Sequence, residues 1–175
     1  MSFERVVLSN LIFSDEFGRK AIPFLKQEYF QEYSDKVIFG IIDDYIKKYN
    51  SFPSIEALAI DLSNKDGLSE DVFKEAKEII STLSYDPNTS LEWILDKTEK
   101  FCQDKALYLA IMQSIKIMDE KNGSISKGSI PSILTDALAV SFDTHIGHDF
   151  LADSNERYEF YHRKEKRVQI GRAHV

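Results

Sequence analysis

The sequence predicts an all-α protein, and three observations support that fold class. Apolar side chains recur at helical spacing along most of the chain. Proline and glycine number only 4 and 7 among 175 residues, and most of them fall between the periodic segments, where helices end. Hydrophobic residues make up 43% and aromatic residues 12%, which is enough to bury a core. We therefore expect a helical head of about five or six helices, a long antiparallel helical hairpin and a linker helix.

The head is expected over residues 1–88, where capping or breaking residues bound each helical segment. Its helices are expected over residues 3–14, 15–22, 34–49, 55–62 and 70–83. Pro23 ends the second of them. The hydroxyl of Ser54 can cap the fourth by accepting a hydrogen bond from a first-turn amide, and Gly67 marks the turn before the fifth. The many carboxylates are expected on the solvated faces of these helices.

The hairpin is expected over residues 89–142, which belong to the same N-terminal domain as the head. Thr89 and Glu92 have the spacing of a capping box, and no proline or glycine follows until Gly123. One helix of about 30 residues is therefore predicted. Its second half, residues 106–118, is apolar on nearly every side and needs cover from more than one direction. Part of that cover is expected from another chain.

The second helix of the hairpin follows a loop that contains two glycines. Ser129 is expected as its N-cap, and Pro131 lies close to the first helical position, where a missing amide costs little. The apolar stripe predicts a helix that runs to about Phe142 and packs antiparallel on the long helix. Residues 143–168 are expected to form a linker and a linker helix, whereas residues 169–175 continue no earlier pattern and are interpreted as an artefactual tail.

Charge and cysteine content restrict the function of the chain. With 22 basic and 29 acidic residues, the net charge of −7 has the wrong sign for a chain that mainly neutralises nucleic-acid phosphates, so weak or no DNA binding is expected. The single cysteine, Cys102, lies in an apolar helical stretch and is expected to be a buried structural thiol in a reducing compartment. No apolar run approaches the roughly 20 residues of a membrane span, so we expect a cytoplasmic protein without a membrane partner.

Candidate catalytic and metal-binding patterns are weak. Gly123 and Gly128 have the spacing of a phosphate-binding loop, but Ser129 stands where the lysine is required, and a hairpin turn is expected instead. His145, His148 and Asp149 could ligate zinc or iron, although no E-x-x-H or H-E-x-x-H motif supplies further ligands from other helices. A small helical metal-dependent hydrolase therefore stays as an alternative, which metal analysis would decide.

Four stretches of the chain resemble the N-terminal region of the T-even phage replicative DNA helicases, which are DnaB-like. They lie at residues 8–13 and 28–30, at Tyr49–Leu58 and at Ser141–Asp149, and the last two are the most distinctive. The resemblance covers about residues 6–168 and includes no catalytic motif.

The resemblance implies that the chain is the N-terminal collar domain of a ring-shaped hexameric helicase. In such proteins the hairpin packs subunits together, the linker helix docks on a neighbouring motor domain, and the collar contacts primase and the helicase loader. The motor domain, which uses ATP and Mg to unwind DNA in the 5′ to 3′ direction, would begin after Val168. No catalytic, cofactor-binding or metal-binding residue is therefore expected in this chain.

The expected subunit and partner interface consists of large apolar residues of the hairpin and two tyrosines of the linker helix. These are Tyr108, Ile111, Met112, Ile115, Met118, Ile133, Leu134, Leu138, Tyr158 and Tyr161. The main alternative is a stand-alone helical adaptor or helicase loader of the same fold. A reading frame that continues into a phosphate-binding motif would exclude it.

Overall fold

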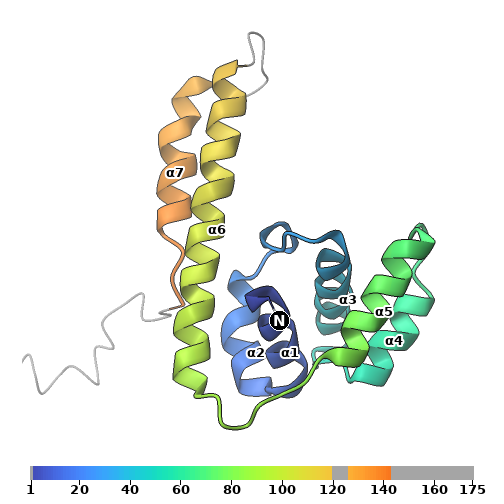
Figure 1. Ribbon diagram of the computed structural model, residues 1–175. Helices are drawn as coiled ribbons and strands as arrows, with labels where there is room; N and C mark the ends of the chain where they lie inside the picture. The colour runs from blue at the N-terminus through green and yellow to red at the C-terminus, as the bar shows by residue number, and fades with distance from the viewer. Residues whose placement is uncertain (1, 120–125, 143–175) are drawn as a thin grey trace, which may run out of the picture. The chain divides into compact units, whose positions relative to one another are not determined.

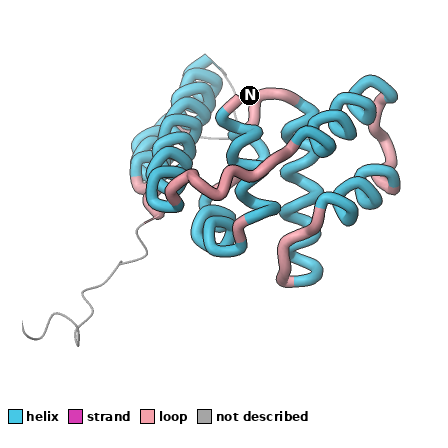
Figure 2. The backbone as a smooth tube through the Cα atoms, turned by 60° about the horizontal axis from the view of Figure 1, so that its bottom comes forward, coloured by secondary structure: helices cyan, strands magenta, loops and turns pink. Residues whose placement is uncertain are grey.

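The computed structural model describes residues 2–119 and 126–142, and within these ranges it is helical with no strand (Figures 1 and 2). The all-α prediction is confirmed. Residues up to Phe142 form one compact unit. Its α-helices are α1 Phe3–Phe13, α2 Asp15–Ala21, α3 Tyr33–Tyr49, α4 Ile55–Ser63, α5 Glu70–Thr82, α6 Leu91–Asp119 and α7 Ile130–Leu138, with 3₁₀ turns η1 Ile22–Phe24, η2 Gln27–Tyr29 and η3 Lys127–Ser129.

Serine caps fix where most head helices begin. Ser2, Ser14, Ser54 and Ser69 each accept a hydrogen bond from the backbone amide three residues later, which satisfies one free first-turn donor. The Ser54 cap is confirmed. Gly67 has φ +81° in the turn between α4 and α5, a conformation that glycine adopts without a steric penalty.

The core of the head joins α1, α2, α3, α4 and α5. Helix α3 packs on α1, α4 and α5, and α4 packs on α5. The largest fully buried side chains are Tyr29, Phe17, Phe30, Phe39, Leu8, Leu11, Ile38, Ile42, Leu58, Leu62, Ile94 and Val7. Each such apolar side chain contributes about 1.5–3 kcal/mol by leaving water. The five predicted head helices are thus held by one continuous core.

Helix α6 has 29 residues, close to the predicted length, but its cap differs from the predicted one. The amide of Trp93 donates to the Ser90 hydroxyl at 3.5 Å, and the Ser90 carbonyl accepts from Ile94, so Ser90 is the N-cap. The prediction of a capping box that begins at Thr89 was wrong. The amide of Thr89 instead bonds the carbonyl of Asp86 in the preceding turn, which shifts the start of the helix by one residue.

Helix α7 is shorter than predicted because the residues after Leu138 make tertiary contacts instead of continuing the helix. Glu99 on α6 accepts a hydrogen bond from the Phe142 amide at 3.1 Å, and Gln103 donates to the Val140 carbonyl at 3.0 Å. The Phe142 ring stacks on Phe24 at a centroid distance of 4.7 Å. These contacts hold residues 140–142 out of the helix that was expected to reach Phe142.

The start of α7 also differs from the prediction in one respect. Pro131 lies in its first turn, as expected, but the side chain of Ser129 makes no capping hydrogen bond within the described residues. Its hydroxyl donates to the carbonyl of Ser126 in the preceding turn at 2.7 Å, and Ser126 itself caps η3. The cap is displaced because the chain enters α7 through a 3₁₀ turn.

Candidate functional site

Helix α6 changes neighbours along its length, because its buried stripe winds around it. Buried residues recur at intervals of four from Ile94 through Cys102 to Ser114. At 3.6 residues per turn, such a stripe drifts by about 40° for each step of four. The first half of α6 therefore packs on α2 and the second half packs on α7 (Figure 1), and α6 also contacts η2. The hairpin predicted from the apolar pattern is confirmed.

The second half of α6 also carries a row of exposed apolar side chains, which we call the apolar arc. On a helical projection these residues span an arc of about 120°, opposite the stripe that faces α7. The arc consists of Tyr108, Ile111, Met112, Ile115 and Met118, which are 60%, 45%, 48%, 47% and 61% exposed. Cover for this side of α6 does not come from the described part of the chain.

The residues expected at a subunit interface fall into three groups. Five of them form the apolar arc, and Leu138 on α7 is 70% exposed. Ile133 and Leu134 are half-buried and pack against the core, so they hold α7 in place. Tyr158 and Tyr161 lie outside the described residues, as do the linker helix and the His145, His148 and Asp149 cluster. The contact of any of these residues with a partner stays a prediction.

Two ion pairs position α6 and α3 against α1, and sequence reasoning missed both. Lys105 on α6 binds the Glu4 carboxylate at 3.1 Å, and Glu4 also accepts the Gln31 amide at 3.0 Å. Arg5 lies 3.4 Å from Asp35 on α3, whose side chain is only 1% exposed. The expectation that carboxylates occupy solvated helix faces is wrong for Asp35, because its place at the start of α3 faces α1.

Burial controls the chemistry of the two ionisable groups in this region. Burial raises the pKa of the Asp35 carboxyl above its ordinary 3.8, and the nearby Arg5 offsets only part of that effect. Burial and the charge of Glu99 raise the pKa of the Cys102 thiol to about 12. Cys102 is fully buried, so the prediction of a buried thiol is confirmed.

Binding features for small ligands are limited in the described residues. No group of three or more His, Cys, Asp or Glu side chains is placed to hold a metal ion there. Within the same ranges, no helix is long and apolar enough to cross a membrane.

Comparison with known proteins identifies the relatives of the chain. No protein-family model matches it. The chain is 32% identical over 171 residues to the DnaB-like replicative helicase of Enterobacteria phage T4, a match that covers 93% of the chain. The chain is related to the DnaB-like replicative helicases.

This relation confirms the resemblance to phage replicative helicases and connects the chain with DNA replication. The chain spans 36% of the length of its helicase relative, which is about a third. Because the match covers 93% of the chain, it includes most residues of the head and the hairpin.

Proposed function

We propose that this chain is the N-terminal collar domain of a DnaB-like replicative helicase and that it assembles subunits into a ring. On this proposal, ATP hydrolysis and 5′ to 3′ unwinding belong to a motor domain of the parent helicase, which uses ATP and Mg. The collar also contacts primase and the helicase loader. The observation that carries the proposal is the apolar arc on α6.

The physical argument concerns the cost of leaving the apolar arc in water. Single exposed apolar residues are common on protein surfaces, but five of them in a continuous row on one helix mark an interaction surface. Burying a large apolar side chain fully is favourable by about 1.5–3 kcal/mol, so an arc of this size can drive association of two copies. Relation to a helicase favours a second copy of the chain as the occupant of the arc.

Sedimentation equilibrium over a wide range of protein concentration tests the proposal. We expect the average mass to rise above the 20.2 kDa of one chain as concentration increases. A mass of one chain at every concentration would remove the support for an assembly domain. In that case a stand-alone adaptor would explain the exposed arc better, because its apolar surface would bind a different partner.

A further inference from the structure

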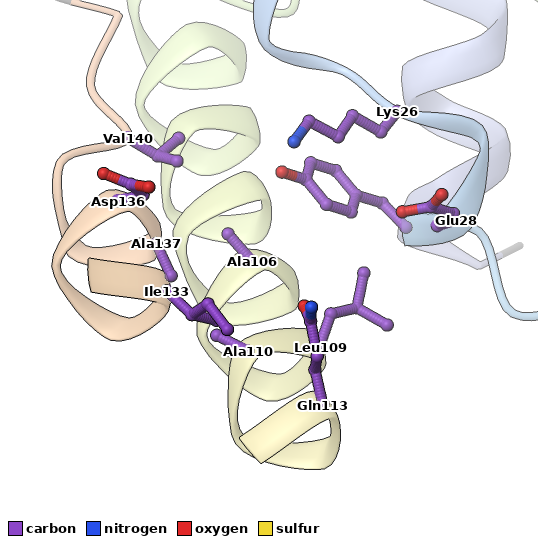
Figure 3. A pocket seen from close by; sticks show the side chains of 11 residues that line it. Lys26, Glu28, Ala106, Leu109, Ala110, Gln113, Ile133, Asp136, Ala137 and Val140 are labelled. Carbon is purple, nitrogen blue, oxygen red and sulfur yellow. The ribbon is translucent and has the colours of Figure 1, made fainter. Parts of the chain in front are cut away.

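A cavity of about 270 Å³ lies between η2 and the two hairpin helices (Figure 3). Its floor is made of small side chains, since Ala106 and Ala110 on α6 and Ala137 on α7 are all buried. Leu109, Ile133 and Val140 complete the apolar lining. The volume is below the roughly 300–1,000 Å³ of sites that enclose a whole small-molecule ligand. It suits one or two protein side chains.

Tyr29 in the wall of this cavity has an unsatisfied hydroxyl. The residue is only 1% exposed, and its hydroxyl has no hydrogen-bond partner among the described residues. Buried polar atoms without partners are rare in folded proteins and cost about 1–3 kcal/mol each. Burial, with the charges of Cys102 and Glu28, raises the pKa of this phenol, so it is a hydrogen-bond donor at neutral pH. The hydroxyl itself has almost no accessible surface, so it lies behind the cavity surface.

The rim of the cavity is acidic. Glu28 on η2 and Asp136 on α7 lie on opposite sides, and both are exposed. Lys26 is the single cationic residue of the lining, and its ammonium group lies 6.0 Å from the centre of the Tyr29 ring. Two carboxylates against one ammonium disfavour a phosphate or another anion and favour a basic group.

We propose that this cavity is a docking site for a peptide segment of a partner protein with one large apolar side chain next to a lysine or arginine. The apolar side chain lies against the three alanines, and the basic side chain lies beside Glu28 and Asp136. The site is on the other side of α6 from the apolar arc, so it does not depend on self-association.

Selection from a random peptide library displayed on phage, with the complete chain as target, tests the proposal. We expect the enriched peptides to share a large apolar residue beside a lysine or arginine. A fluorescently labelled enriched peptide then serves as the probe for titrations by anisotropy. Absence of enrichment, or enrichment of acidic peptides, would overturn the proposal.

Two sets of variants locate the peptide on the chain. The exposed pair Glu28→Lys and Asp136→Lys is expected to weaken peptide binding by at least about tenfold, because it reverses the rim charge. The matched pair Glu78→Lys and Asp96→Lys changes the net charge equally, at exposed positions outside the cavity, and is expected to leave binding unchanged. Equal weakening by both pairs would assign binding to the net charge and contradict the site.

Tyr29→Phe separates binding from stability. Because the hydroxyl is unpaired and lies behind the cavity surface, its removal is expected to leave resistance to urea unchanged or higher and to leave peptide affinity unchanged. Loss of stability would mean that a bound water satisfies the hydroxyl, which would contradict the unpaired state of this atom. An Ile115→Lys variant, altered in the apolar arc, is expected to bind the peptide as the unmodified chain does. Loss of binding there would contradict a separate site.

Discussion

Lys105 on α6 donates a hydrogen bond to the carboxylate of Glu4 on α1 at 3.1 Å, although the two residues are 101 positions apart in the sequence. The other carboxylate oxygen of Glu4 accepts the amide of Gln31, just after η2. One side chain therefore ties the first helix of the head to the long helix that carries the apolar arc. The side chains of Glu4 and Lys105 are only 13% and 28% exposed, so solvent screens the pair weakly.

Replacing Glu4 by glutamine is expected to lower the free energy of unfolding by about 1–2 kcal/mol, since a charge-assisted contact is lost while Lys105 keeps its charge. Urea denaturation followed by circular dichroism measures this. Glu16→Gln is the matched control, because its pair with Lys20 is exposed on α2 and should contribute nothing measurable. Equal effects of the two substitutions would contradict the role of Glu4.

Asp35 is expected to make the chain less stable as pH rises. Its pKa in the folded chain lies above the ordinary 3.8, so its contribution to stability is fully present below that pH and is lost as pH rises through the folded pKa. Asp35→Asn removes this titration. The free energy of unfolding of the unmodified chain should therefore fall relative to that of the variant as pH rises from below 3.8 through the folded pKa. If the free energy of unfolding of the unmodified chain, relative to that of the variant, stays constant or rises with pH, the expectation is contradicted.

The cap of α6 can be assigned by a pair of alanine substitutions. Ser90→Ala is expected to lower the free energy of unfolding by about 0.5–1 kcal/mol, because the Trp93 amide loses its acceptor. Thr89→Ala should cost less, since the structure gives the hydroxyl of Thr89 no capping role. Thermal unfolding of the two variants decides between the two caps. A larger loss of stability for Thr89→Ala would support a capping box that begins at Thr89.

The thiol of Cys102 is expected to be unreactive in the folded chain. With a pKa raised to about 12 and no exposed surface, it is almost entirely protonated and shielded at neutral pH. A chromogenic disulfide reagent should modify it only at the rate at which the chain unfolds, and fully in urea. Fast modification of the native chain would show that the first half of α6 is loosely packed.

Local sequence signals were enough to predict most helices of the head. The cap at Ser54 and the turn at Gly67 depend on residues within a few positions of the helix ends, so they can be recognised without the fold. The end of α7 could not be predicted, because the Phe142 amide donates a hydrogen bond to Glu99 on α6 instead of to a carbonyl of its own helix. Contacts between residues about 40 positions apart override the local preference there.

Only part of the candidate site could be predicted from the sequence. The second half of α6, which is apolar on nearly every side, indicated that one chain could not cover it, and the exposed Ile111 and Ile115 agree with that reasoning. The buried Asp35 gave no signal, because its partner Arg5 lies 30 positions earlier on another helix. The unsatisfied hydroxyl of Tyr29 likewise depends on how η2 meets the hairpin.

Sedimentation equilibrium of the unmodified chain beside Ile115→Lys and Asp96→Asn tests the assembly role of the apolar arc most directly. Both substitutions change the net charge by the same amount, but only Ile115 lies in the arc. We expect the unmodified chain and Asp96→Asn to associate equally, and Ile115→Lys to associate at least about tenfold more weakly, because a lysine would be buried between copies. Association of Ile115→Lys that equals that of the unmodified chain would contradict assembly through the arc.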